Sequence, residues 1–297
     1  MYATGASSTA ADARMLSRMD SSWFSSVALT GVVLRVGDLG RVAAFYEAVL
    51  GLGRAAMDAG GVALRTARGA PLVVLEPADR AAARPRGAAG LFHVAFLYDD
   101  RPALAAALRR VIDARIPIGS ADHGVSEAIY LSDPEGNGIE LYVDRPRDRW
   151  PPAQPDGQVA MVTDPLDVDA LLAVSAPTAG PPARIGHVHL SVVDLVQAER
   201  FYGDFLGFAV TQRTYPGALF LSRDGYHHHL GANTWRSNRP AVPGAPGLER
   251  FTISLAATDE LEGVATRLAG AGHPFQRAGD TIDTHDLDGI AVRISSL

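Results

Sequence analysis

The sequence of 297 residues contains no cysteine. This absence excludes disulfide bonds, thiolate metal sites, iron–sulfur clusters and a cysteine nucleophile. Any metal ion would therefore have to be bound by histidine, aspartate or glutamate side chains.

Long hydrophobic runs and a concentration of positive charge are also missing. The apolar stretches are interrupted by charged residues or glycine. Their lengths are well below the roughly 20 residues that a membrane-spanning helix needs. The net charge is -6, and Lys and Arg are scattered, so the chain has no basic stripe of the kind that binds nucleic acid. With 47% hydrophobic and 20% charged residues, the composition is globular. We therefore expect small-molecule ligands, and neither a membrane nor a nucleic-acid partner.

The chain repeats itself at a constant spacing. The segment Val32-Val-Leu-Arg-Val-Gly-Asp-Leu matches Val188-His-Leu-Ser-Val-Val-Asp-Leu, with an offset of 188 − 32 = 156 residues. Downstream, Tyr46 matches Tyr202 at the same offset, 202 − 46 = 156. A constant offset over such a length predicts duplicated structure.

Each copy has the pattern of a strand followed by a helix. From His187 onward apolar and polar residues alternate, so His187 and His189 share the face opposite Val188 on a half-buried strand. Asp194 then stands where an N-cap belongs, and apolar residues follow at helical spacing until Gly207 ends the helix. Two divergent copies, 91–143 and 250–297, bring the number of modules to four.

The composition also divides the chain into regions. Residues 146–183 are rich in Pro, Asp and Ala and predict an interdomain linker. We expect an N-terminal domain of modules one and two at 28–145, and a C-terminal domain of modules three and four at 184–297. Residues 1–27 lack the apolar core of a signal peptide and predict a flexible tail on a cytoplasmic protein.

Three motifs resemble the vicinal oxygen chelate superfamily, which includes the glyoxalases and extradiol dioxygenases. They are His-x-x-Leu-x-Val-x-Asp-Leu from His187, Phe-Tyr-x-x-x-Leu-Gly-Phe from Phe201, and Asp-Pro-x-Gly-Asn-x-Ile-Glu from Asp133. The resemblance covers nearly everything after about residue 28. It implies an α+β fold of four βαβββ modules that form two half-barrel pairs, in which a pair surrounds one divalent metal ion.

Within that superfamily the chain looks most like the bacterial catechol 2,3-dioxygenases. The segments 125–142 and 225–235 bring this similarity. The resemblance implies an Fe(II)-dependent extradiol dioxygenase that cleaves a small aromatic diol with O2. Mn(II) or another divalent metal is the alternative cofactor.

The resemblance also implies two histidine ligands from first strands and one glutamate from a last strand. Module one has Gly31 where the repeat places His187, and module four offers no ligand. Modules two and three together supply His93, Glu140 and His187, so we predict that module two pairs with module three, and module one with module four. The alternative is that His93 is a satisfied core histidine and that Glu140 lies on an exposed edge strand. Alternation along the strand nevertheless points Glu140 into the barrel, where a carboxylate needs a cation.

Proton transfer is assigned to the run His227-His228-His229. Aligned on the family motif, His228 is predicted to be the acid–base residue, because its ionisation lies near neutral pH. Because strand side chains alternate, His228 faces opposite to His227 and His229, which then support the site or pack. The alternative is a solvated polar loop end or an incidental metal-binding cluster.

Further pocket residues follow from the resemblance. Tyr130, ten residues before Glu140, corresponds to a tyrosine that hydrogen-bonds substrate, and His123 to a further pocket histidine. His189 is predicted to line the barrel beside His187, and Trp235 to wall the aromatic pocket, although a core position is the alternative for Trp235.

Two other functions of the superfamily stay open at this point. One is a metalloenzyme of the glyoxalase or resistance type, in which the metal acts as a Lewis acid and His228 is not needed. The other is a metal-free binding protein, since fold alone does not establish function. A homo-oligomer, with modules paired between subunits, is equally compatible with the sequence.

Overall fold

The computed structural model describes most of the chain, in the ranges 26–57, 60–66, 69–79, 85–174 and 180–296. The predicted N-terminal tail, residues 1–27, therefore lies almost entirely outside the described residues. Val27 already begins the first strand.

The predicted four βαβββ modules are confirmed, and each has one helical segment after its first strand. Module one consists of β1 (Val27–Val36), α2 (Leu39–Leu50), β2 (Gly53–Ala56), β3 (Val62–Arg65) and β4 (Pro71–Pro77). Module two consists of β5 (Gly90–Leu97), α3 (Arg101–Asp113), β6 (Gly119–Asp122), β7 (Ser126–Ser132) and β8 (Gly138–Asp144).

The second half of the chain repeats this order. Module three consists of β9 (Arg184–Ser191), α5 (Leu195–Ala198), the π-helix η3 (Glu199–Phe205), β10 (Ala209–Gln212), β11 (Ala218–Ser222) and β12 (Leu230–Asn233). Module four consists of β13 (Gly247–Leu255), α6 (Thr258–Gly270), β14 (Phe275–Ala278), β15 (Thr281–His285) and β16 (Ala291–Ser296).

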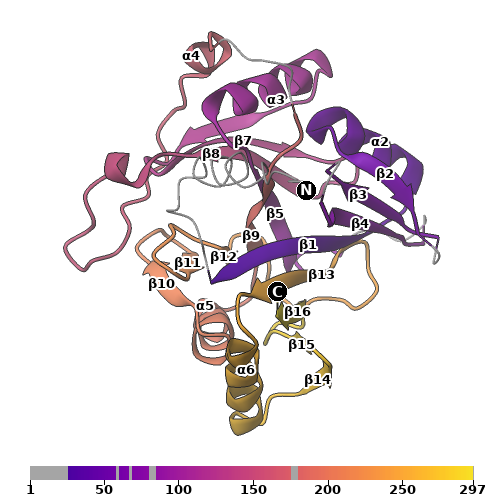
Figure 1. Ribbon diagram of the computed structural model, residues 1–297, viewed down its shortest axis with the longest axis vertical. Helices are drawn as coiled ribbons and strands as arrows, with labels where there is room; N and C mark the ends of the chain where they lie inside the picture. Colours follow the sequence, from indigo (N-terminus) through magenta and orange to yellow (C-terminus); the bar gives the residue numbers. More distant parts are fainter. Residues whose placement is uncertain (1–25, 58–59, 67–68, 80–84, 175–179, 297) are drawn as a thin grey trace, which may run out of the picture.

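The modules pair as the sequence predicted. Strand β5 of module two runs antiparallel to β9 of module three, with Val94 opposite Val188. Strand β1 of module one runs antiparallel to β13 of module four, with Val32 opposite Phe251. A short contact between β1 and β9 joins the two pairs into one continuous sheet, and β1, β9 and β5 are successive neighbours at its centre (Figure 1). Each half-barrel thus takes one module from each half of the sequence.

The helices begin where the sequence places caps. Asp38 accepts a hydrogen bond from the backbone N–H of Arg41 at the start of α2, and Gly51, with φ 69°, ends that helix. Asp194 caps α5 in the same way. The helix expected to continue regularly to Gly207 differs, because α5 is one turn long and passes into η3. In this wider turn the aromatic side chains Phe201, Tyr202 and Phe205 are all buried in the core.

The segment 146–183 does more than connect. It contains the 3-10 turn η2 (Arg147–Arg149) and, where a helical turn was expected, α4 (Val168–Leu172). Between them, the backbone of Asp164 forms an isolated antiparallel β-bridge with that of Asp122, and the backbone N–H of Val159 donates to the carbonyl of Thr211. The segment therefore contacts modules two and three across their shared barrel. The domain limits given above stay a prediction.

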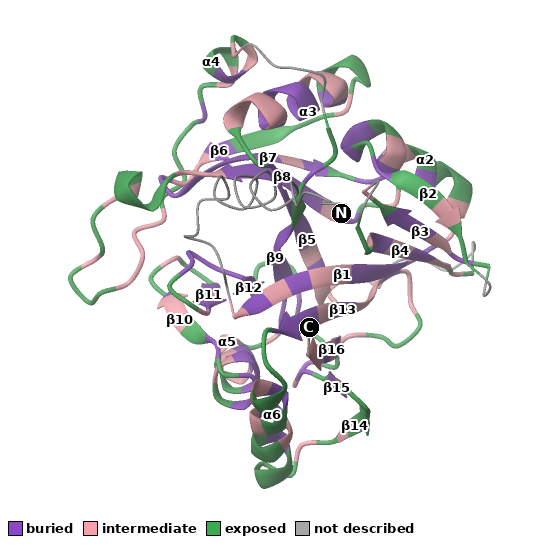
Figure 2. Ribbon diagram, viewed as in Figure 1, coloured by how far each residue is buried: buried purple, intermediate pink, exposed green. Residues whose placement is uncertain are grey.

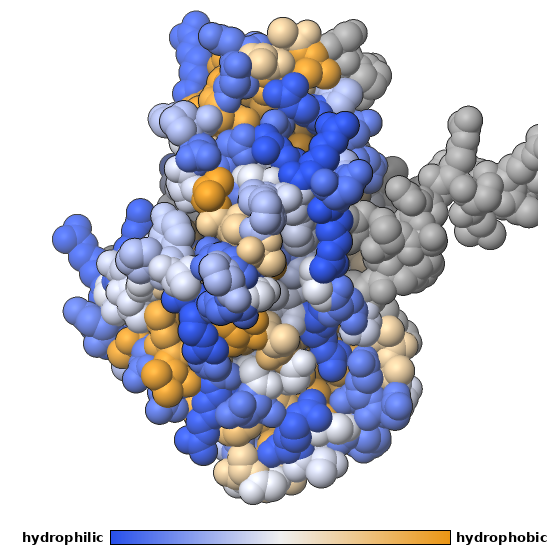
Figure 3. All heavy atoms as spheres, turned by 90° about the vertical axis from the view of Figure 1, so that its left-hand side faces the viewer, coloured by the Kyte–Doolittle hydropathy of each residue, from blue (hydrophilic) through white to orange (hydrophobic). Residues whose placement is uncertain are grey.

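The core lies between the helices and the sheet and continues along the central strands. Figure 2 shows β5 and β9 buried where they cross the middle of the molecule, whereas α6 and α4 expose much of their surface. On the face shown in Figure 3, hydrophobic side chains form separate small groups among hydrophilic ones. None of the helices in the described residues is long and apolar enough to cross a membrane.

Candidate metal centre and cavity

Three buried side chains converge where β9, β5 and β8 lie next to one another. His93 extends from β5, Glu140 from β8 and His187 from β9. Their Nε2, Oε2 and Nε2 atoms are close together: His93 to Glu140 is 2.9 Å, His187 to Glu140 is 3.0 Å, and His93 to His187 is 3.3 Å. Among the described residues this is the group of titratable side chains whose ligand atoms are near enough to share one metal ion. The structure thus brings together the three residues predicted as ligands.

The spacing of these atoms fits an octahedral ion. Ligand atoms at right angles to one another, with metal–ligand bonds of about 2.1 Å, are separated by about 3 Å. The three distances between the ligand atoms of His93, Glu140 and His187 lie close to that value on either side. Two imidazoles and one carboxylate on one face would leave adjacent positions open for exogenous ligands.

The electrostatics of the group also suit a cation. Burial raises the pKa of Glu140, but the imidazoles of His187 and His93 outweigh it and hold that pKa well below its ordinary value. Burial lowers the pKa of His187, and Glu140 opposes this only in part. An ionised carboxylate beside a neutral imidazole is the protonation state that metal ligands need.

Two glycines allow the strands to approach at this place. A Cβ atom on Gly138 would lie 2.0 Å from the carbonyl oxygen of Phe92, the residue next to His93. A Cβ atom on Gly186 would lie 1.7 Å from the hydroxyl oxygen of Tyr142. Only glycine fits at either position without moving its neighbours, so the approach of β8 to β5 depends on Gly138, and the approach of the Tyr142 side chain to β9 depends on Gly186.

The three side chains form part of the wall of a cavity of about 360 Å³. This volume is within the range of small-molecule sites. His123, Tyr130, His189, His228 and Trp235, all predicted as site residues, also line it. Much of the remaining wall is apolar, and includes Phe92, Ile139, Met161, Val162 and Phe220.

His123 and Tyr130 form a hydrogen-bonded pair at one side of the cavity. Nε2 of His123 lies 2.6 Å from the hydroxyl oxygen of Tyr130, and Nδ1 lies 2.6 Å from the carbonyl oxygen of Val162. Because a carbonyl only accepts, Nδ1 carries the proton and Nε2 accepts from the tyrosine hydroxyl. Burial and the nearby Glu140 raise the pKa of Tyr130 well above its ordinary value, so the phenol keeps its proton.

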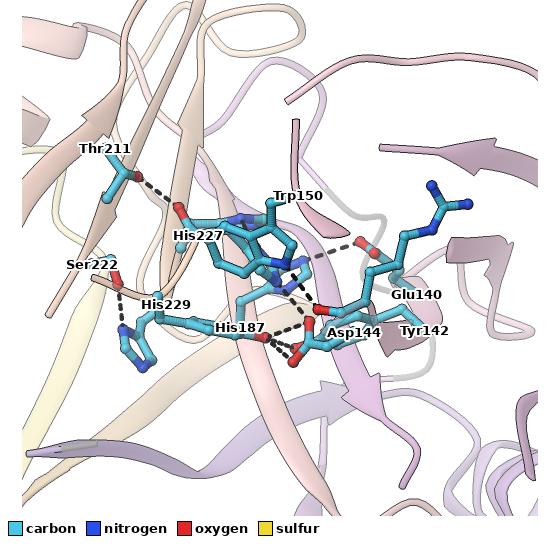
Figure 4. A network of polar contacts seen from close by, with 12 residues as sticks. Glu140, Tyr142, Asp144, Trp150, His187, Thr211, Ser222, His227 and His229 are labelled. Carbon is cyan, nitrogen blue, oxygen red and sulfur yellow. Dashed lines mark hydrogen bonds and ion pairs between the residues drawn. The ribbon is translucent and has the colours of Figure 1, made fainter. Parts of the chain in front are cut away.

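The three consecutive histidines separate, although the expected reason was wrong. They lie in a bend that precedes β12, so strand alternation does not apply to them. Only His228 lines the cavity. Nε2 of His227 lies 2.8 Å from Asp144, and Nδ1 of His229 lies 3.0 Å from the hydroxyl of Ser222, as Figure 4 shows. These hydrogen bonds, and not the pleat of a strand, direct the rings of His227 and His229 away from the cavity, while the rings of His227 and His228 stay in contact, with their Nδ1 atoms 2.8 Å apart.

His189 and Trp235 form the aromatic end of the cavity. The ring of His189 lies 5.1 Å from that of Phe92 and 5.8 Å from that of Trp235. Its Nε2 atom is buried without a hydrogen-bond partner in the described residues. Burial, with the neighbouring His93 and His187, holds the pKa of His189 well below its ordinary value. Trp235 is 45% exposed, so it stands at the edge of the cavity and not in the core.

Several cavity residues escaped the sequence analysis. Met161, Val162 and Thr163 belong to the predicted linker, and Gln212, Tyr215 and Arg236 lie in module three. The backbone of Met161 accepts a hydrogen bond from Gln212, which fixes the segment against β10. Nothing in the local composition of 146–183 indicates a cavity wall, since this role depends on how the segment crosses the barrel.

Comparison with known proteins agrees with this geometry. The model of the Glyoxalase/Bleomycin resistance protein/Dioxygenase superfamily matches residues 28–141 and 184–291. Catechol-2,3-dioxygenase of Bacillus subtilis (strain 168) is 42% identical over 224 residues, which are 72% of this chain and 78% of that protein. A Bacillus subtilis structure with a provisional dioxygenase assignment aligns with a TM-score of 0.63 and 14% identity, covering 91% of this chain and 84% of that one. Glyoxalase I from Zea mays aligns with a TM-score of 0.54 and 18% identity, covering 94% and 95%. At these identities the two structures show a shared fold.

Proposed function

The chain belongs to the glyoxalase/bleomycin resistance protein/dioxygenase superfamily, and we propose that it is an Fe(II)-dependent extradiol dioxygenase that opens the ring of a catechol-type diol with O2. The observation that carries this proposal is the convergence of His93, Glu140 and His187 beside His228 and Tyr130 in one apolar cavity. The relationship to the Bacillus subtilis catechol-2,3-dioxygenase supports an oxidoreductase.

His93, Glu140 and His187 would hold the metal. When bound, the ion supplies the site at which the two diol oxygens and O2 come together, and the means of passing electrons between them. Two nitrogen ligands and one oxygen ligand suit Fe(II), and Mn(II) is the alternative. Glu140 and His187 are ready to take up a cation, because the lowered pKa values leave the carboxyl ionised and the imidazole neutral.

The rest of the cavity fits a flat aromatic ring whose polar edge faces Glu140. Phe92, Ile139 and Phe220 supply apolar wall, and the hydroxyl of Tyr130 supplies a polar group close to the ligands. The ring centroid of Tyr130 lies 5.6 Å from that of His93, which supports a role for this tyrosine beside the diol oxygens. Apolar walls exclude water and orient the ring by its shape, whereas the few polar groups select the hydroxyls.

His228 transfers the proton in this scheme, and the phenol of Tyr130, which keeps its own proton, orients the diol. Burial, together with His187 and His227, holds the pKa of His228 well below its ordinary value, so its ring is neutral and can accept a proton from a diol hydroxyl. The same ring returns the proton to the opened product. Both atoms of O2 enter that product, so atoms and electrons balance without another reductant.

The test is anaerobic loading with Fe(II), followed by catechol and O2, with the yellow semialdehyde and oxygen uptake measured together. We expect one O2 consumed per ring opened, and loss of the reaction in Glu140→Ala and His228→Ala. His285→Ala is the matched control, because His285 is exposed on the other module pair and activity should be unchanged. Stoichiometric metal without ring opening on several catechols would contradict the proposal and favour a Lewis-acid function.

A further inference from the structure

A chain of hydrogen bonds extends from the cavity into the protein behind His228. Nδ1 of His228 lies 2.8 Å from Nδ1 of His227, and Nε2 of His227 lies 2.8 Å from Oδ1 of Asp144. His227 is completely buried, and only 14% of the Asp144 side chain is exposed. Figure 4 shows His227 and Asp144 side by side. Asp144 ends β8, four residues after Glu140.

With an ionised carboxylate and two neutral imidazoles, these hydrogen bonds can be arranged in only one way. An ionised carboxylate only accepts, so Nε2 of His227 donates to Asp144. A neutral His227 then has an unprotonated Nδ1, which accepts from the Nδ1–H of His228. A neutral His228 consequently has its lone pair on Nε2, the ring nitrogen that is left for the cavity.

We propose that Asp144 and His227 are positioning residues that hold His228 in the tautomer whose Nε2 accepts the proton of the diol. This inference rests on the proposed function and deepens it. Without Asp144, His227 could carry its proton on Nδ1 instead of Nε2 and would then donate to Nδ1 of His228. The proton of His228 would move to Nε2, so this ring would present an N–H to a substrate that is itself a donor. A carboxylate that orients an imidazole is known to control catalysis in this way.

The surroundings hold the carboxylate in place. The hydroxyl of Tyr226 donates to Asp144, at 3.1 Å from Oδ1 and 3.0 Å from Oδ2, and the hydroxyl of Tyr142 lies 2.7 Å from that of Tyr226. The ring of Trp150 lies 5.6 Å from that of His227 and closes the other side. Asp144 thus keeps two donors, His227 and Tyr226, and only the first leads to His228.

The kinetic test compares the two donors to Asp144, of which only His227 is linked to His228. In the Fe(II)-loaded enzyme we expect Asp144→Asn to lower kcat on catechol about 100-fold, because the general base is lost. KM should change little, because the walls of the cavity stay the same. Tyr226→Phe is the matched control: it removes the other donor to the same carboxylate, and kcat should fall less than about threefold. In a His228→Gln background, Asp144→Asn should cost less than about twofold more, because it acts through His228.

A spectroscopic test needs neither turnover nor a variant. Long-range ¹H–¹⁵N correlation spectra of the Zn(II)-loaded wild type should show His228 protonated at Nδ1 and unprotonated at Nε2. Protonation at Nε2, or an undiminished kcat in a folded Asp144→Asn variant, overturns the inference. If the wild type opens no catechol, the proposed function fails. The ring-nitrogen spectra still decide whether Asp144 and His227 set the tautomer of His228.

Discussion

The two module pairs share one architecture but differ in what occupies equivalent positions. The pair of modules two and three has His187, His93 and Glu140 at its centre. In the pair of modules one and four, Gly31 occupies the place of His187 (187 − 31 = 156), and Arg293 that of Glu140 (286 − 133 = 293 − 140 = 153). The strand registers, Val94 opposite Val188 and Phe251 opposite Val32, place Arg250 where His93 would be.

This difference shows how one fold handles polar groups in two ways. In modules one and four, Arg293 binds Asp283 with two hydrogen bonds of 2.7 Å, and Thr30, Ser254 and Ser295 form a chain of hydroxyls. These groups satisfy one another. In modules two and three, one buried carboxylate faces two imidazoles, an arrangement that is complete only when a cation or a proton is shared between them. The proposed chemistry is therefore confined to one pair.

The largest expected effect comes from making the two pairs more alike. Glu140→Gln removes the negative ligand, so Fe(II) affinity and ring-opening activity should fall by more than about 100-fold, beyond what loss of a supporting hydrogen bond costs. Arg293→Gln, at the equivalent position of the other pair, should leave metal content unchanged. Metal content after dialysis and steady-state kinetics measure both. Equal metal content in wild type and Glu140→Gln would contradict the assignment.

Removal of the metal should destabilise the protein. A ligand at about 1,000 times its dissociation constant stabilises the folded state by about 4 kcal/mol, so adding Fe(II) or Zn(II) anaerobically to the chelator-treated protein should raise Tm by roughly 10 °C. Thermal unfolding followed by circular dichroism measures this shift. The same addition to Glu140→Gln should leave Tm nearly unchanged, and an equal rise in both proteins would place the ion elsewhere.

The close approach of the strands gives a prediction about backbone packing. Gly138→Ala should destabilise the fold by about 1–3 kcal/mol and disturb the ligand group, because its Cβ would overlap the carbonyl of Phe92. In Gly31→Ala the new Cβ would lie 3.4 Å from the nearest atom, the carbonyl oxygen of Pro71, and the change in stability should be smaller. Denaturant unfolding of both variants decides between them. A Gly138→Ala protein as stable as Gly31→Ala would show that this contact is not needed.

Stability should also depend on pH. Burial, and secondly the neighbouring His227, lower the pKa of His229 from 6.5 to about 3, so below pH 6.5 the unfolded chain binds a proton that the folded protein does not. The free energy of unfolding should therefore fall by up to about 1.4 kcal/mol per pH unit on acidification from 6.5 toward 3 because of this residue. His229→Gln should reduce the slope of stability against pH in that window. An unchanged slope would contradict the buried, neutral state of His229.

Asp286, which lies between β15 and β16 of module four, should make stability depend on pH in the opposite direction. Burial raises its pKa from 3.8 to about 6, so between these values the folded protein binds more protons than the unfolded chain. Its contribution to stability is complete below pH 3.8 and is lost as the pH rises through 6. Asp286→Asn should therefore make the slope of stability against pH more positive in that interval. Unfolding curves at several pH values, compared with those of His229→Gln, test this contrast.

The sequence predicted those features that depend on local pattern or on the repeat. The cap residue Asp194 and the four modules follow from local pattern and the repeat, and the ligand set His93, Glu140 and His187 follows from the family resemblance. The π-helix after α5 and the bend at His227–His229 did not, because both depend on packing against distant residues. The role of Asp144 was hidden for the same reason, since its partner His227 lies 83 positions away along the chain.

The most direct test of the account is to locate the metal. Crystals loaded anaerobically with Fe(II) should give, in an anomalous difference map at the iron edge, one peak per chain within about 2.1 Å of Nε2 of His93, Nε2 of His187 and a carboxylate oxygen of Glu140. No peak should lie near Arg250 and Arg293. An iron peak at any other position, with the three side chains still hydrogen-bonded to one another, would contradict the central claim.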